Sequence, residues 1–157
     1  MNREQRRAAK FKRGQQWDRN AAADPLASMR QISICAPFPP EEVASESVSM
    51  RMAWHRLTHG DGTTQDMNVI ANCCNVALIH AERIDDLVVD LVMRADAAIK
   101  AMDARYMRTG RWGADAAALS DVPPMLDLYD QLLELGTPAT MVGALNESIK
   151  RMREEAA

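Results

Sequence analysis

Glycine and proline are absent from one long stretch of this 157-residue chain, between Gly62 and Gly110. Because the two residues that most often end helices are missing there, the sequence predicts helix from Thr63 to Thr109. Apolar or small side chains recur along this stretch in alternating steps of three and four residues, the pattern of a helix packed along its length. These positions are Met67, Ile70, Cys74, Ala77, Ala81, Ile84, Val88, Leu91, Ala95, Ala98 and Met102.

An unbroken helix over this stretch would reach about 70 Å, which is too long to be buried inside one small globule. The sequence therefore predicts a long central helix that other helices, or a second chain, must cover. Its most polar part runs from Arg83 to Asp86, and we expect any bend or break to fall there. One chain covers the sides of such a helix thinly, so we also expect a homodimer.

Aromatic residues are scarce, at 4% of the chain, whereas methionine is frequent, with 11 residues. Together with 47% apolar residues, this composition favours helix over sheet and allows one core. We predict an all-α fold, an elongated bundle of about four helices around the central one. Residues 26–157 would form a single helical domain, and residues 1–25 a flexible basic arm.

Cysteines are few and long apolar runs are lacking. Three cysteines, two of them adjacent, do not make a disulfide framework and indicate reduced, buried thiols in a cytoplasmic protein. No apolar run reaches 18 residues, so we expect no membrane span. The basic N-terminus is not followed by the apolar segment of a secretion signal.

A first flanking helix is predicted from about Pro40 to Thr58, with proline at its first position. Gly60 and Gly62 mark the turn that follows it. Thr63 and Asp66 then have the spacing of a capping box at the start of the central helix. The short turn predicts that the first helix folds back along the central helix as far as about residue 83.

The C-terminal part predicts an αα-hairpin. Pro123 and Pro124 would open its first helix, Gly136 would end that helix, and Thr137 and Pro138 would begin the second. The apolar face of the second helix is Val142, Leu145, Ile149 and Met152. We expect this hairpin to cover the distal half of the central helix, from residue 84 to residue 106.

Charge is distributed unevenly. Residues 1–20 carry seven Lys or Arg and two acidic residues, a net charge of +5, whereas the rest of the chain has a net charge of −8. One interpretation is a solvated, frayed terminus. The other is an arm that binds nucleic acid through phosphate contacts, or an acidic protein surface. On one helical face this arm would present Arg3, Arg6, Arg7, Lys10 and Arg13.

Motifs of catalysis are lacking: there is no phosphate-binding glycine loop, nucleophile elbow or HExxH sequence. We therefore expect no catalytic residue, no cofactor and no enzyme activity. His55 and His59 have the i,i+4 spacing of metal ligands, although histidines that cap a helix end give the same pattern. We expect the second of these, and no metal.

One internal turn combines arginines with an aromatic residue. Arginine and tryptophan are enriched at the energetic centres of protein interfaces, so this turn is the internal candidate for partner binding. Alternatively, Trp112 fills the junction between the central helix and the hairpin. The candidate residues are Arg105, Arg108, Arg111 and Trp112.

The opening MNREQRRAAK resembles the Asn-Arg-x-Gln-Arg-Arg-Ala start of many small proteins of bacterial prophages and plasmids. The stretch from Ala53 to Glu82 is similar to uncharacterised proteobacterial proteins of the same kind. The resemblance implies an accessory protein of a mobile element in the bacterial cytoplasm, and no functional residue carries over from it. With the charge and motif arguments, we predict a non-enzymatic regulator or inhibitor that binds a host or phage protein. The alternative is a nucleic-acid-associated protein.

Overall fold

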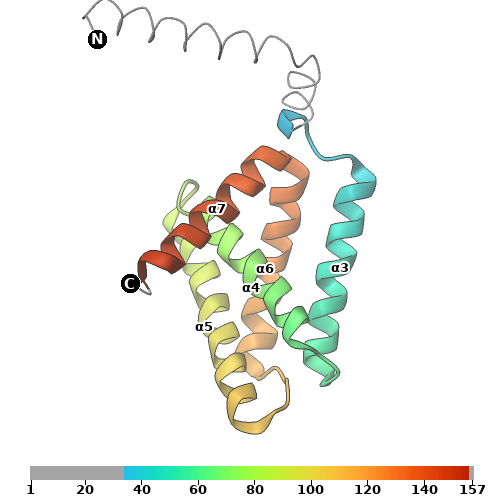
Figure 1. The fold of residues 1–157 in the computed structure, drawn as a ribbon, viewed down its shortest axis with the longest axis vertical. Helices are drawn as coiled ribbons and strands as arrows, with labels where there is room; N and C mark the ends of the chain where they lie inside the picture. The colour runs from blue at the N-terminus through green and yellow to red at the C-terminus, as the bar shows by residue number, and fades with distance from the viewer. Residues whose placement is uncertain (1–33, 156–157) are drawn as a thin grey trace, which may run out of the picture. The chain divides into compact units, whose positions relative to one another are not determined.

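The computed structural model describes residues 34–155, and from Pro37 onward the chain forms one compact unit. This unit is all-helical, as predicted, and residues 37–155 contain no strand. The predicted basic arm, including Arg3, Arg6, Arg7, Lys10 and Arg13, lies outside the described residues. The five helices are α3 (Pro40–His59), α4 (Thr64–Ala81), α5 (Asp86–Thr109), α6 (Ala116–Leu135) and α7 (Pro138–Glu155) (Figure 1).

Helix α3 begins and ends where the sequence predicted. Pro40 occupies the first turn beside two glutamates, and Gly60 closes the helix with a φ of 87°, a left-handed conformation that favours glycine. Met50, Ala53 and Leu57 are the buried residues, at steps of three and four. This face therefore packs α3 onto the rest of the bundle.

The predicted capping box at the start of α4 is confirmed. The Asp66 backbone N–H donates to Thr63 Oγ1, and the Asp66 carboxylate accepts from the Thr63 backbone N–H at 2.9 Å. The same carboxylate pairs with Arg56 of α3, whose Nε lies 3.0 Å from Oδ1. Helix α4 contacts each of the other four helices and is the centre of the bundle.

The single long helix predicted from Thr63 to Thr109 is wrong, because the chain turns between α4 and α5. The turn falls within residues 82–85, close to the polar stretch where we expected any break. The Asp85 side chain accepts from the Leu87 backbone N–H at 2.8 Å and caps α5. Cys74 and Ala95, two of the recurring apolar positions of the predicted helix, are nevertheless buried, on two neighbouring helices that pack on each other.

Helix α6 begins seven residues before the predicted start at Pro123. Asp115 caps it by accepting from the Ala118 backbone N–H at 2.9 Å, and three alanines form its first turn. Both prolines lie inside the helix, where each removes a backbone donor. Ala118 and Val122 are fully buried, and this packing holds the residues ahead of the prolines in the helix.

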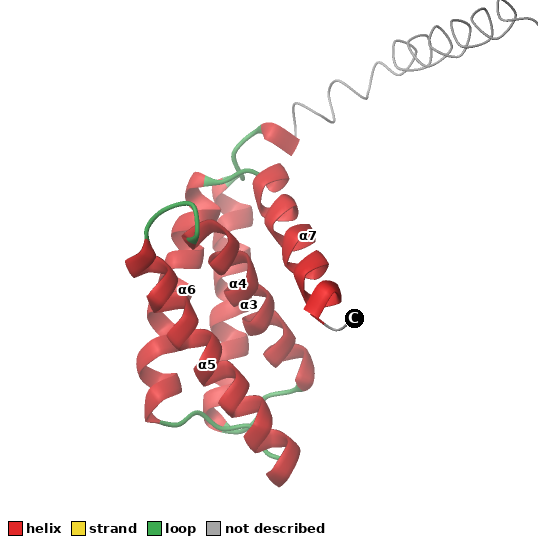
Figure 2. Ribbon diagram, turned by 90° about the vertical axis from the view of Figure 1, so that its left-hand side faces the viewer, coloured by secondary structure: helices red, strands yellow, loops and turns green. Residues whose placement is uncertain are grey.

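Helix α7 follows α6 after Gly136 and Thr137, as predicted, but the predicted cover of the central helix is only partly right. Helix α6 packs on α5, whereas the main contact of α7 is with α4. Figure 1 shows α7 crossing over α4, and Figure 2 shows it on one side of the bundle. One side of α7 therefore lacks a neighbouring helix within the described part of the chain.

Candidate protein-binding surfaces

The arginine-rich turn connects α5 to α6, and part of it holds this connection together. Arg105 donates from Nη1 to the Gly113 carbonyl at 2.8 Å and from Nη2 to the Asp115 carboxylate at 2.5 Å. The Ala118 N–H and then Arg105 lower the pKa of Asp115. Arg105 thus stabilises the carboxylate that caps α6.

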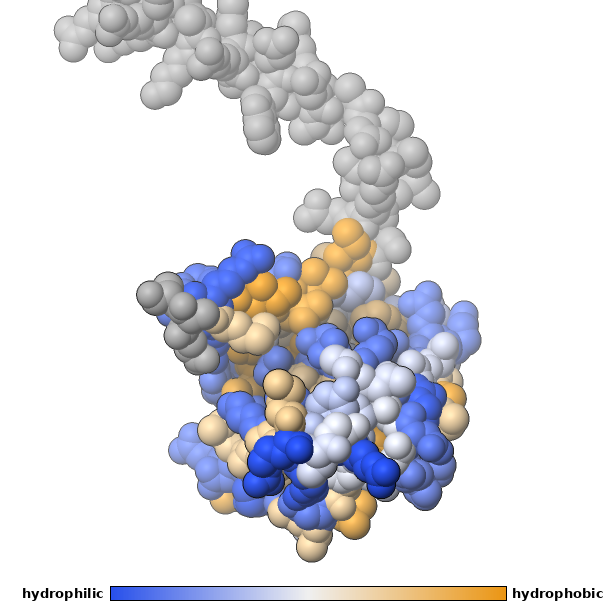
Figure 3. Space-filling view, turned by 60° about the horizontal axis from the view of Figure 1, so that its bottom comes forward, coloured by the Kyte–Doolittle hydropathy of each residue, from blue (hydrophilic) through white to orange (hydrophobic). Residues whose placement is uncertain are grey.

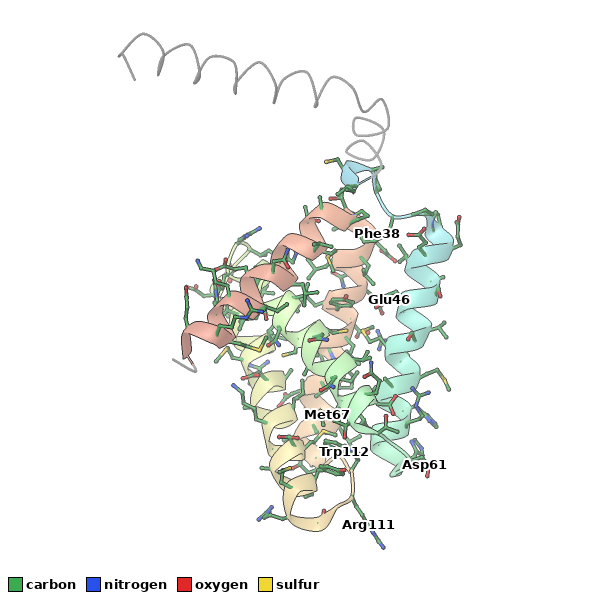
Figure 4. All side chains as sticks on the ribbon, in the orientation of Figure 1. Phe38, Glu46, Asp61, Met67, Arg111 and Trp112 are labelled. Atoms are coloured by element: carbon green, nitrogen blue, oxygen red, sulfur yellow. The ribbon has the colours of Figure 1, made fainter. Side chains whose placement is uncertain are left out.

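Trp112 is buried, with 6% of its surface exposed. Its ring stacks on Tyr106 of α5, with the two ring centroids 4.0 Å apart and the ring planes within 3° of each other. Figure 4 shows Trp112 lying against the lower part of α5. The structure therefore places this side chain in the α5–α6 junction, the alternative that the sequence left open.

Arg108 and Arg111 remain exposed at the same turn. Neither guanidinium takes part in an ion pair within residues 34–155, whereas Arg105 does. The four predicted interface residues are thus brought together by one turn but divide into two groups. Only Arg108 and Arg111 are free to meet a partner, and neither is backed by an exposed aromatic anchor.

A more extensive apolar surface lies on α7. Val142, Leu145, Ile149 and Met152, which we name the α7 stripe, recur at steps of three and four. The sequence predicts these residues as the apolar face with which the hairpin covers the central helix, but Val142 is 55% exposed and Met152 is 46% exposed. Leu145 and Ile149 are half-buried. Figure 3 shows hydrophobic surface gathered over α7 beside hydrophilic surface.

Helix α7 packs on α4 through a neighbouring face, which leaves the stripe partly exposed. Met141, Ala144 and Ser148 are buried, and the small side chains of the last two let α7 approach closely. One turn further, Arg151 forms two hydrogen bonds to the Glu82 carboxylate, at 2.7 and 2.9 Å. This pair lowers the pKa of Glu82 and links α7 to the residue that follows α4.

A groove of about 630 Å³ borders the stripe between α4, α5 and α7. Met93 of α5 and Met152 of α7 are two of its exposed apolar residues. Flexible methionine side chains adapt to different partner shapes, which suits a protein-binding groove. The stripe and the groove together offer an apolar surface that the arginine turn lacks.

The two histidines at the end of α3 stack on each other, and the two adjacent cysteines of α4 are buried in the core. The rings of His55 and His59 stack with centroids 3.9 Å apart, and His59 Nδ1 lies 2.8 Å from the His55 carbonyl oxygen. Cys73 and Cys74, the cysteine pair of α4, are both buried, and burial raises the pKa of each thiol to about 12. Within residues 34–155, no three His, Cys, Asp or Glu side chains are grouped as a metal site requires.

None of the helices between residues 34 and 155 is both long and apolar enough to cross a membrane. Comparison of the chain with protein-family models, with curated proteins and with solved structures found no match.

Proposed function

We propose that this chain is a non-enzymatic, protein-binding accessory of a bacterial phage or mobile element, a cytoplasmic regulator or inhibitor that contacts a host or phage protein. The α7 stripe is the observation that carries the proposal. A helix that leaves apolar side chains such as Val142 and Met152 about half exposed beside its packing face is typical of a surface that a partner covers. The neighbouring methionine-lined groove extends the apolar area that such a partner would bury.

The energy available from the stripe is moderate. Full burial of one aliphatic side chain contributes roughly 1.5–3 kcal/mol, so covering the exposed half of Val142 or Met152 would contribute roughly 1 kcal/mol each. Two such residues do not hold a complex together, since association itself has a cost of several kcal/mol. The partner must therefore also contact the groove, and we expect an interface that includes both surfaces.

Affinity capture from a bacterial host lysate tests the proposal with three forms of the full chain. We expect the unchanged chain to recover one stoichiometric partner, and the Val142→Ser/Ile149→Ser variant to lose it. The matched control is Met107→Ser/Leu119→Ser, which removes two exposed apolar residues from α5 and α6 and should keep the partner. Recovery of no stoichiometric partner, or equal recovery by the two variants, would contradict the proposal.

A homodimer is a second use of the same stripe. The sequence predicts a dimer because one chain would cover the central helix thinly, but α4 contacts each of the other four helices. The support is now the stripe itself, because an apolar face of this kind can pair with its copy across a two-fold axis. Light scattering at micromolar concentration should give a dimer for the unchanged chain and a monomer for Val142→Ser/Ile149→Ser. A stable monomer in both cases rules the dimer out.

The alternative function is nucleic-acid association through the basic arm. Residues 34–155 carry 11 basic and 19 acidic residues, a net charge of −8, so phosphate contacts would depend on residues 1–20. Deletion of those residues should then abolish a salt-sensitive shift of DNA or RNA in a gel. An unchanged shift, or no shift with the full chain, excludes this function.

A further inference from the structure

A second hollow surface, with different chemistry, lies between α3 and α6. It consists of two hollows of about 400 and 380 Å³ that share Phe38 and Val43, and we name it the α3–α6 cleft. Leu133 and Met141 extend its apolar lining. In Figure 4, Phe38 and Glu46 lie on the side of α3 that faces α6.

Carboxylates line both hollows at matching spacing, and they come from a different helix in each hollow. Glu42 and Glu46 lie on α3, while Asp130 and Glu134 lie on α6. Each pair is separated by four residues, so on each helix the two side chains are neighbours along one face, roughly 5–6 Å apart. Each hollow therefore has its own pair of carboxylates, next to the apolar residues Phe38 and Val43 that the two hollows share.

Within residues 34–155, one cation forms ion pairs with these carboxylates. Arg51 donates from Nη2 to Asp127 and Asp130, at 2.6 Å in both cases. With Asp127 included, five carboxylates accompany one guanidinium, a local net charge of −4. The three glutamates of the cleft take part in no ion pair within residues 34–155. The second oxygen of Asp130 is buried without a hydrogen-bond partner in that part of the chain.

The negative field reaches the groups buried nearest the cleft. Burial is the main cause of the raised pKa of Cys73 and of Tyr129, and Glu46 and Asp130 raise both further. The charges on the two helices thus act on the same interior region, although the side chains that bear them come from different elements.

We propose that the α3–α6 cleft binds a basic amphipathic segment of a partner protein, with an apolar side chain against the half-buried Phe38 and Val43 and Lys or Arg side chains beside the glutamates. Two spaced rows of carboxylates match a linear ligand with several cations better than a single ion. The same charges repel the phosphates of a nucleic acid, and they repel the cleft of a second copy. This proposal does not depend on the α7 stripe, since it involves other side chains and another ligand chemistry.

Fluorescence anisotropy tests the proposal with the full chain and a labelled helical peptide of leucine and lysine, with leucine at steps of three and four. In the cleft variant, Glu42→Gln, Glu46→Gln and Glu134→Gln are combined. The control variant combines Asp61→Asn, Asp86→Asn and Asp90→Asn, which removes the same charge from exposed positions elsewhere. Circular dichroism verifies that both variants keep the helical fold.

We expect the peptide to bind the unchanged chain, and the cleft variant to bind it about tenfold more weakly, because three ion pairs are lost. The control variant should change the affinity less than about twofold, since its charges lie outside the cleft. Equal weakening by both variants would show general charge attraction and overturn the proposal. Undiminished binding of a serine–lysine peptide, or no binding of the leucine–lysine peptide, would overturn it as well.

Methyl NMR of the methionines locates the peptide independently of any substitution. Met141 lines the cleft and Met107 is exposed on α5, so the peptide should shift the methyl signal of the first and leave the second unchanged. A shift of Met152 without one of Met141 would place the peptide on the α7 surface and overturn the assignment. A peptide-dependent dimer in light scattering would also contradict it, because the bound peptide should leave the protein's oligomeric state unchanged.

Discussion

Asp66→Asn removes one charge from the point where α3 and α4 are joined. The Asp66 side chain is 6% exposed, and its two oxygens accept from Arg56 of α3 and from the backbone N–H and hydroxyl of Thr63. Asparagine keeps the shape and one acceptor oxygen, so the capping geometry survives. What the substitution removes is the interaction of the negative charge with its donors.

The pKa of Asp66 gives the size of this loss. Hydrogen bonding to Arg56, and then to Thr63, outweighs the effect of burial and lowers the pKa from 3.8 to about 2. That shift corresponds to about 2 kcal/mol of unfolding free energy at neutral pH. Because the folded-state pKa is depressed, this stability is present above the unfolded pKa and is lost as the pH falls from about 4 through about 2.

Urea denaturation followed by circular dichroism measures the effect. The difference in unfolding free energy between the unchanged chain and Asp66→Asn should be about 2 kcal/mol at pH 7 and should approach zero near pH 2. Asp61→Asn serves as the control, because Asp61 is exposed in the same turn and should change stability by less than about 0.5 kcal/mol. A difference that stays constant from pH 7 to pH 2 would refute the reasoning.

Other predictions concern packing and reactivity. Trp112→Ala should destabilise the protein by about 3–5 kcal/mol in urea denaturation, because a buried ring leaves a cavity, whereas a binding role alone would leave stability unchanged. Gly62→Ala would place a Cβ 2.7 Å from Leu57 Cδ2 and should cost about 1–3 kcal/mol in the same assay. Gly113→Ala meets no atom within 4 Å and should be close to neutral. With a thiol reagent at pH 8, the exposed Cys35 should react at once, and the cysteine pair of α4 only after denaturant is added; three equally fast thiols would disprove this.

The helical class, the bounds of α3 and the capping box were readable from the sequence because each depends on neighbours a few residues apart. Pro40, the two glycines of the turn and the Thr63–Asp66 spacing act locally. The buried positions of α4 were likewise predictable, since Ile70, Cys74 and Ala77 follow helical spacing whichever helix covers them. Local chemistry therefore determined element type and most of the core.

The predicted bounds of two helices were wrong where the N-cap is an aspartate, because apolar spacing or a proline gave the stronger signal in the sequence. Asp85 is the N-cap of α5 and separates it from α4. The apolar positions nevertheless keep their three–four spacing across it, from Ala81 to Val88, and this spacing predicts one continuous helix. Asp115 starts α6 in the same way, although Pro123 looked like the stronger start. In both cases a single side-chain hydrogen bond to a backbone N–H decides the boundary, and its partner is fixed only when the helix forms.

The candidate sites differ in how far the sequence could reach them. The sequence placed the arginines next to one another near the α5–α6 turn. It left open where Trp112 points, and the structure turns this side chain inward, where its ring stacks on that of Tyr106, six residues earlier. That contact depends on the path of the turn, which spacing does not encode.

The rotation of α7 about its axis depends on tertiary contacts that the local sequence does not predict. Its apolar residues predict that the stripe faces the core, yet the helix is rotated by roughly 90° from that expectation, at 100° per residue. The pair between Arg151 and Glu82, which are 69 residues apart, holds the end of the helix in this rotation. The small side chains of Ala144 and Ser148 allow the close approach to α4 that brings the two charges together. Without this pair, in Arg151→Leu, α7 should rotate so that the stripe turns toward the core. The exposed Met152 should then become protected from oxidation. Unchanged oxidation of Met152 would show that packing alone sets the rotation.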